Sequence, residues 1–244
     1  MCRIPRSGPT WTPCVSDQAY VIAIDGPAAS GKSSTATWVA EQLGVRHVDS
    51  GALYRAVTLA CLAHAGPGDA WTEERALAAA DEVHIHEAEA GLTLKVGGML
   101  LTPELLAGAE VTAHVSQVAR MQVVRDWVNA RLRACAVAGP IVVDGRDMGT
   151  TVFPGAALKI FLIADPWERA RRRLTQRLGR KPHDDEIARE TDDLVRRDAR
   201  DAQQSQPAPD AVLIDTTYLT QDEQVSRIVA LARAATGGTW TPRG

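Results

Sequence analysis

The amino-acid sequence predicts an α/β fold in which helices cover both faces of a parallel sheet. Short runs of β-branched and other apolar residues alternate with helical stretches over most of the 244 residues. The expected strands span residues 20–25, 45–49, 140–145, 158–164 and 211–215. Strands that alternate with helices imply right-handed crossovers and parallel pairing, so both faces of the sheet become buried.

The first expected strand leads into a glycine-rich segment, GPAASGKSS, at residues 26–34. Its spacing is that of a phosphate-binding loop, in which successive backbone N–H groups point at an anion. The next residues continue at helical spacing and end at Gly44, so the loop leads into a helix. The N-terminus of that helix also favours negative charge at the loop. Lys32 is expected at the β- and γ-phosphates of a nucleotide and Ser33 on Mg²⁺. The phosphate-binding residues are then Gly26, Pro27, Ala28, Ala29, Ser30, Gly31, Lys32, Ser33 and Ser34.

Polar residues mark the ends of the expected strands. These are Asp25, Asp49 and Ser50, the run from Asp144 to Asp147, and Asp215. In parallel sheets, ligands bind beyond the carboxyl ends of the strands. The sequence therefore predicts a site at one rim of the sheet.

The segment at residues 83–101 alternates with period two and carries turn signals at Gly91 and at Gly97 and Gly98. This pattern predicts a small antiparallel meander, inserted between helical stretches. His84 and His86 share a face of the expected strand and invite a metal interpretation. Ordinary solvated histidines are the favoured alternative, because no third ligand of suitable spacing lies near in the sequence.

Composition limits the classes of function. The net charge of −3 gives no support for a nucleic-acid partner, and the four cysteines have no paired spacing that suggests zinc or disulfides. No apolar stretch approaches the roughly 18 residues of a membrane span, and the opening residues lack a signal-peptide core. We expect a cytoplasmic protein without a membrane partner. Residues 1–18 and 236–244 are expected to be loose extensions.

Three blocks of sequence carry a family resemblance: VIAIDGPAASGKSS, HVDSGALYRAVTLA and VVDGRDMGTTVFPGAALKIFLIA. Together with the insert, they resemble the bacterial cytidylate kinases, the (d)CMP kinases of the nucleoside monophosphate kinase family. The resemblance implies a three-layer P-loop domain over residues 19–235, with a helical lid at about 167–184. It also implies transfer of the γ-phosphoryl group of ATP to CMP or dCMP with Mg²⁺. We expect a monomer.

The resemblance assigns roles to individual residues. Arginines suit phosphate, because a planar guanidinium clamps oxygens at two points and stays charged. An aspartate can accept from the cytosine amino group while an arginine donates to the ring acceptors. The implied CMP-binding residues are Ser50, Arg55, Ser116, Arg125, Arg146, Asp147, Arg197 and Asp201, of which Arg146 is also catalytic.

The basic stretch at residues 167–184 matches the lid of the family. Arg169 is implied at an ATP phosphate, and Arg172 or Arg173 at the transferring phosphate. A solvated helix face is the alternative for this charge run, as are a surface ion pair for Arg55 and a structural serine for Ser116. No general base is evident in the sequence. None is needed, because the CMP phosphate is itself an anionic nucleophile. Either Asp144 or Asp49 is expected to hold Mg²⁺ through water.

One position departs from the family pattern. After the lid, family members usually carry Arg-Asp-x-x-Asp-x-x-Arg, whereas RDARDAQQ places Gln204 where the last arginine belongs. Arg200 lies one helical turn before Gln204, beside Arg197 and Asp201. We hypothesise that Arg200 replaces the missing arginine. The alternative is an exposed arginine that pairs with a nearby acid.

Two other classes of function stay open at this point. One is a P-loop kinase for a different small molecule, which the blocks DSGALYR and DGRDMGT disfavour. The other is a nucleotide-dependent switch or binding module. The chain lacks the guanine-reading pattern N-K-x-D, and its second set of arginines implies a second phosphorylated substrate.

Overall fold

The computed structural model describes residues 20–65, 71–88, 91–202 and 204–237. The expected N-terminal extension and most of the expected C-terminal one lie outside these residues. The core is a five-stranded parallel sheet in the order β2-β6-β1-β7-β8. Its strands are β1 (Val21–Asp25), β2 (Arg46–Asp49), β6 (Ile141–Gly145), β7 (Leu158–Ile163) and β8 (Val212–Asp215). The predicted strands and the predicted α/β class are confirmed.

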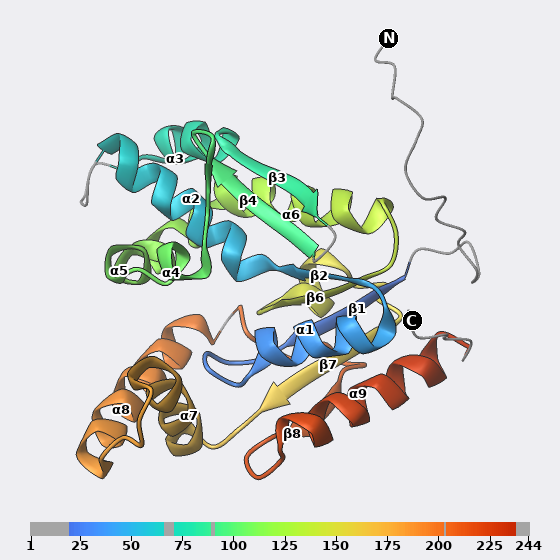
Figure 1. Ribbon diagram of the computed structural model, residues 1–244. Coiled ribbons are helices and arrows are strands. Elements are labelled where there is room, and N and C mark those ends of the chain that lie inside the picture. The colour runs from blue at the N-terminus through green and yellow to red at the C-terminus, as the bar shows by residue number, and fades with distance from the viewer. Residues whose placement is uncertain (1–19, 66–70, 89–90, 203, 238–244) are drawn as a thin grey trace.

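Alternate residues of the strands are buried against two separate layers of helices, one on each face of the sheet. Ile22 and Ile24 of β1 pack against α1 (Lys32–Leu43) and α9 (Gln221–Ala235) on one face. Ala23 faces the other core, built from α2 (Ser50–Ala65), α3 (Glu73–Asp81) and α6 (Gln122–Val137). Figure 1 shows the sheet between these layers. This is the three-layer arrangement that the alternation of strands and helices predicts.

The insert forms a separate antiparallel sheet of three strands, β3 (Val83–Ala88), β4 (Gly91–Val96) and β5 (Met99–Leu100). Val83 and Leu94 are buried against the core that includes α2. His84 and His86 are exposed, opposite Lys95 and Thr93. The chain then continues through α4 (Pro103–Leu106) and α5 (Ala109–Val118). The predicted meander is confirmed.

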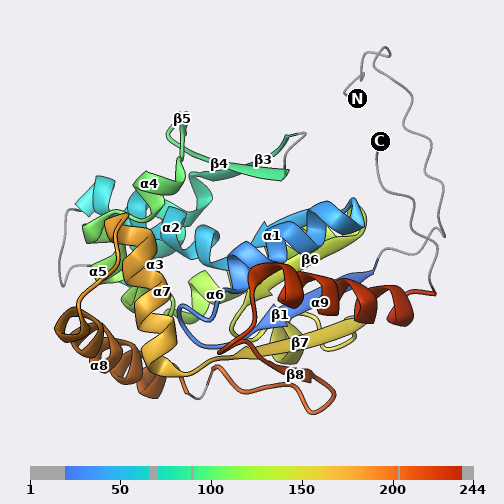
Figure 2. The ribbon, with the colours of Figure 1, turned by 60° about the horizontal axis from the view of Figure 1, so that its bottom comes forward.

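The basic helix α7 (Pro166–Leu178) and the mixed-charge helix α8 (Asp184–Asp201) form a hairpin at one end of the sheet. Figures 1 and 2 place them side by side, next to the loop that precedes α1. Leu174, Ile187 and Leu194 bury a small apolar core that also includes Ala28 of that loop. The lid expected at about 167–184 thus covers α7 and the turn to α8, and the apolar face of this helix pair rests on the phosphate-binding loop.

The loop itself adopts backbone conformations that favour glycine. Gly26 has φ 150° and Gly31 has φ 89°, while Ala29 has φ 58°. A Cβ atom on Gly26 would lie 2.3 Å from the carbonyl oxygen of Leu162 in β7. A side chain at this position therefore forces β1 and β7 apart. A short π-helix, η1 (Met148–Val152), follows β6 at the same rim.

Within the described part of the chain, no helix combines the length and the apolar character needed to cross a bilayer.

Because of the close contact with β7, we predict that Gly26→Ala lowers the free energy of unfolding by about 1–3 kcal/mol or more. Denaturant unfolding measures this change. Gly155→Ala is the matched control, because Gly155 is exposed and a Cβ there meets no atom within 4 Å. We expect the control to stay within about 0.5 kcal/mol of the parent. Equal stabilities for the two variants would contradict the packing argument.

Candidate active site

Lys32 begins α1 and lies inside the phosphate-binding loop. Its Nζ donates a hydrogen bond to the Pro27 carbonyl oxygen at 2.6 Å. Loss of hydration lowers the pKa of Lys32 to about 8, and the positive charge of Arg146 adds to this effect. Asp144 and Asp25 act in the opposite direction. An anion bound in the loop would therefore stabilise the charged form of this buried ammonium group.

Ser33, the next residue, belongs to a chain of polar contacts between α1, β2 and β6. Its Oγ donates to Asp144 Oδ2 at 2.6 Å, and His47 Nε2 lies 2.7 Å from Asp144 Oδ1. His47 Nδ1 is 3.2 Å from Thr37 Oγ1. Burial alone would lower the pKa of His47, but the hydrogen bond and charge of Asp144 outweigh burial and raise it. His47 and Thr37 were not among the residues predicted from sequence.

The same region has the donor chemistry of a magnesium site. Burial and the charge of Asp144 raise the pKa of Asp49 to about 6, while the charge of His47 acts in the opposite direction. No described group of three or more His, Cys, Asp and Glu side chains is arranged to hold a metal ion by itself. Mg²⁺ instead keeps several waters and is held by one or two carboxylates besides phosphate oxygens. Ser33 and the two carboxylates fit that requirement.

Asp25 connects β1 to the short π-helix. It accepts hydrogen bonds from the backbone N–H groups of Met148, at 2.9 Å, and Gly149, at 2.7 Å. Burial is the main reason that the pKa of Asp25 rises to about 6, and these two bonds oppose the rise. This buried aspartate fixes the segment that follows Asp147 against the first strand.

A cluster of arginines gathers beside the loop, from α2, α7, α8 and the end of β6. Arg146 lies 3.0 Å from Asp201, and Arg197 lies 3.7 Å from the same carboxylate oxygen. In the described residues, Nη1 of Arg146 is buried and has no hydrogen-bond partner. Burial, followed by the charges of Arg146, Arg173 and Arg55, lowers the pKa of Arg197. The excess positive charge and the unpaired buried donor suit a phosphate group.

Arg55 reaches this cluster from α2. One of its terminal nitrogens donates to the Leu106 carbonyl oxygen at 3.0 Å and to Thr112 Oγ1 at 3.2 Å. Burial and the charge of Arg173 lower its pKa, while Asp49 raises it. Arg55 thus connects α2 to α4 and α5 through these two hydrogen bonds. The charges of Asp49 and Arg173 both act on it. Ser50, at the start of α2, donates to the Asp144 carbonyl oxygen at 2.7 Å.

Arg125 and Asp147 form a second, separate feature of the rim. Nη2 of Arg125 and Oδ2 of Asp147 make a short ion pair, in which both side chains are largely buried. The other arm of Arg125 lies 3.4 Å from Gln204 Oε1. Burial raises the pKa of Tyr54 to about 12, and the charges of Arg125 and Asp147 act on it in opposite directions. Ser116 is half-buried on α5 and has no polar contact with these residues in the part of the chain described.

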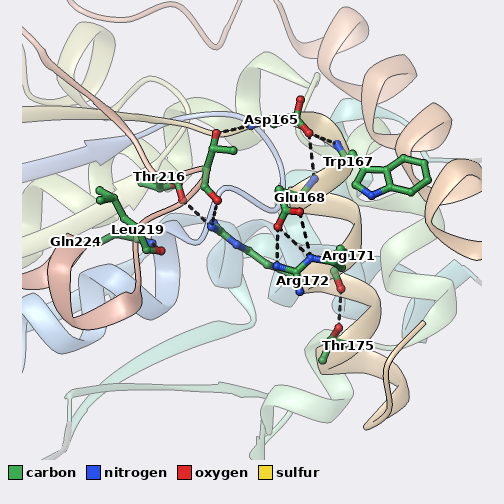
Figure 3. Close-up of polar contacts among 10 residues, drawn as sticks. Asp165, Trp167, Glu168, Arg171, Arg172, Thr175, Thr216, Leu219 and Gln224 are labelled. Atoms are coloured by element: carbon green, nitrogen blue, oxygen red, sulfur yellow. Dashed lines mark hydrogen bonds and ion pairs between the residues drawn. The ribbon is translucent and has the colours of Figure 1, made fainter. Parts of the chain in front are cut away.

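Two of the expected lid arginines contact protein carbonyls. Nη2 of Arg172 donates to the carbonyl oxygens of Thr216, at 2.5 Å, and Thr217, at 2.8 Å. Figure 3 shows Arg172 reaching toward Thr216, away from the ion pair of Arg171 and Glu168. Arg169 donates to the Ala28 carbonyl oxygen and pairs with Asp198. Both guanidinium groups therefore donate to backbone carbonyls, of the loop for Arg169 and of the segment after β8 for Arg172.

Arg173 and Arg200 lie on the other face of the hairpin. Arg173 pairs with Glu190 at 3.2 Å, and its charge acts on Arg55 and Arg197. Arg200 is exposed, and its Nε donates to the Arg196 carbonyl oxygen at 3.3 Å. A cavity of about 250 Å³ is lined by Arg173, Arg177, Glu190, Asp193, Leu194, Arg196, Arg197 and Arg200. Arg200 therefore shares a cavity with residues of the arginine cluster.

A glycine loop at a helix start, a hydroxyl beside carboxylates and a facing cluster of arginines define a P-loop phosphotransferase with two phosphorylated substrates. Comparison with known proteins then gives the family. The family model described as Cytidylate kinase matches residues 22–234, and the chain belongs to the cytidylate kinase family.

Several curated relatives are similar along almost their whole length. A cytidylate kinase of Thermus thermophilus is 46% identical over 217 residues, covering 87% of this chain and 98% of that protein. One from Geobacillus kaustophilus is 42% identical over 224 residues, covering 88% and 97%. A solved gluconokinase structure from Sinorhizobium meliloti is 17% identical with a TM-score of 0.44, covering 90% of this chain and 95% of that chain. That likeness is too distant to bear on function.

The lowered pKa of Lys32 predicts a pH dependence of ATP binding. Lys32 in the free enzyme loses its proton as pH rises through about 8, whereas bound phosphates favour the ammonium form. The affinity for an ATP analogue should therefore fall above pH 8, by up to about tenfold per pH unit. Calorimetry between pH 6.5 and 9.5 measures this. Lys32→Arg is the control, because a guanidinium keeps its charge. A parent affinity that is flat across this range would contradict the prediction.

Proposed function

We propose that this protein transfers the γ-phosphoryl group of ATP to CMP or dCMP, giving ADP and CDP or dCDP. The observation that carries the choice of acceptor is the ion pair of Arg125 and Asp147. Arg125 is a hydrogen-bond donor and Asp147 an acceptor, and the two side chains lie side by side and largely buried at the rim. Membership of the cytidylate kinase family supports the same acceptor.

In this proposal, the cytosine edge inserts between the two partners of the pair. Asp147 accepts from the exocyclic amino group, and Arg125 donates to the ring nitrogen and carbonyl oxygen. Uracil turns a carbonyl oxygen toward Asp147 and leaves both groups unpaired, which a buried site rejects. Tyr54, whose pKa responds to the charges of both partners, would give the base an aromatic neighbour.

The acceptor phosphate occupies the arginine cluster. The unpaired Nη1 of Arg146 and the guanidinium of Arg197 face it, and Asp201 holds these two arginines at a fixed spacing. Arg55 and Arg173 add positive charge from α2 and α7. The acceptor oxygen is anionic near neutral pH, so no side chain has to remove a proton from it.

The donor phosphates occupy the loop before α1. Lys32 exchanges its bond to the Pro27 carbonyl oxygen for the β- and γ-phosphates and stabilises their charge in the transition state. Ser33, with Asp144 and Asp49 through water, would hold Mg²⁺. When bound, Mg²⁺ supplies positive charge between the phosphates of ATP.

Closure of α7 and α8 excludes water, which would otherwise compete as acceptor. Of the two arginines expected at the transferring phosphate, the contacts favour Arg173. Its partner Glu190 is a side chain, whereas Arg172 already donates to two backbone carbonyls. The monomeric state and the cytoplasmic location stay predictions.

A coupled assay of ADP release with CMP, dCMP, UMP and AMP tests the function and the reading of the base. We expect CMP and dCMP to be the preferred acceptors. In Asp147→Ala, kcat/KM should fall more for CMP than for UMP, and the preference should narrow by about 1–3 kcal/mol.

Asp147→Asn refines this test, because its amide can donate to the uracil oxygen and so should favour UMP relative to the alanine variant. Losses of equal size for CMP and UMP would show that Asp147 supports the site without reading the base. Turnover of a different acceptor in preference to CMP would overturn the proposed function.

Arg200 is proposed to supply the phosphate contact that Gln204 lacks the charge to make. Arg200→Ala should then reduce kcat/KM for CMP by about 1.5–3 kcal/mol, the range for a hydrogen bond to a charged group. The KM for ATP should change little. Arg189→Ala is the matched control, since Arg189 is exposed on the same helix and pairs with Asp185. If both variants stay within about twofold of the parent, Arg200 has no role in binding CMP.

A further inference from the structure

An ion pair between α7 and α8 encloses one residue of the phosphate-binding loop. Arg169 Nη1 lies 2.7 Å from Asp198 Oδ2 and donates to the Ala28 carbonyl oxygen at 2.8 Å. The other oxygen of Asp198 accepts from the Ala28 backbone N–H at 3.3 Å. Both polar groups of a single loop residue are thus bound by the hairpin.

The pair is built into the interior of the hairpin. The Arg169 side chain is 4% exposed and that of Asp198 23%, and Arg169 Nε donates to the Ala164 carbonyl oxygen at 3.1 Å. Ala28 packs in the small apolar core of the hairpin with Leu174 and Leu194. By contrast, the pair of Arg189 and Asp185 on α8 has side chains that are 73% and 71% exposed. A buried pair with several backbone partners holds its geometry far better than an exposed one.

These contacts bear directly on the shape of the loop. Ala29 follows Ala28 and has φ 58°, a left-handed conformation that costs an alanine roughly 1–2 kcal/mol. Strained backbone of this kind persists where its surroundings fix it. Arg169 and Asp198 fix the two successive peptide units before and after Ala28. The loop that receives the donor phosphates is therefore held in shape by the lid.

The same helix also reaches the acceptor side. Arg197 directly precedes Asp198 on α8, and Asp201 follows one turn later and pairs with Arg146. An acceptor phosphate that holds Arg197 in place therefore also holds Asp198 against Ala28. The two nucleotide sites thus share one rigid element.

We propose that Arg169 and Asp198 are positioning residues that couple the two sites, so that binding of the acceptor nucleotide strengthens binding of ATP through α8. This inference rests on the proposed function, because it takes the arginine cluster as the site of the acceptor. Coupling between binding sites is reciprocal, so ATP strengthens acceptor binding by the same factor.

Calorimetry with a non-hydrolysable ATP analogue and Mg²⁺, in the presence and absence of saturating CMP, measures the coupling factor. In the parent protein, we expect CMP to tighten binding of the analogue by about tenfold, within the range usual for coupled sites. In Asp198→Asn, the factor should fall to about twofold or less. The asparagine can still accept from the Ala28 N–H but no longer pairs with the charge of Arg169.

Asp185→Asn is the matched control, since it removes an exposed carboxylate from the same helix. Its coupling factor should equal that of the parent within about twofold. A purely structural role for Asp198 would weaken both nucleotides and leave the factor unchanged. Should thermal melting show that Asp198→Asn is not folded, Arg169→Lys provides the same test, because lysine keeps the charge without the forked geometry.

The outcomes separate the two proposals. If CMP does not bind the parent protein, the proposed function fails and the coupling fails with it. If CMP binds the parent but leaves the affinity for the analogue unchanged, or if coupling survives in a folded Asp198→Asn, the coupling inference alone is overturned. Loss of the factor in Asp198→Asn, with the factor kept in Asp185→Asn, supports it.

Discussion

The architecture of the rim follows from one electrostatic constraint: several positive charges are buried close to one another. Lys32 has a pKa of about 8 and Arg197 has a lowered pKa, and the charge of Arg146 contributes to both shifts. Without a phosphate, these side chains depend on Asp201, Asp144 and backbone carbonyls to offset the cost of burial. Such a site is built at the expense of stability and recovers that free energy when anions bind.

Features of the fold that arise from neighbouring residues could be predicted from sequence. The phosphate-binding loop is one, because its glycines, Lys32 and Ser33 are contiguous and need only a strand before and a helix after. The meander is another, since period-two alternation between glycines is a local pattern. The contact of His47 with Asp144 was missed, because it depends on the parallel register that places β2 beside β6.

The direction in which a long side chain points was the other feature that could not be predicted from sequence. Arg169, Arg172 and Arg173 lie within five residues on α7, and the sequence shows only that all three are basic. Helical geometry sends them to three surroundings: the phosphate-binding loop, the end of β8 and Glu190. Which arginine meets a phosphate depends on carbonyl groups far away in the sequence, such as those of Ala28 and Thr216. No spacing rule within the helix contains that information.

The inserted sheet offers a place for protein engineering. Gly97 and Gly98 form the turn between β4 and β5, and a Cβ atom at either would meet no atom within 4 Å. Figure 2 shows β5 at the outer end of this sheet, away from the loop before α1. An exposed turn of this kind is where chains best accept added residues. A fluorescent reporter or affinity tag inserted at this turn would leave the contacts of the active-site residues unchanged.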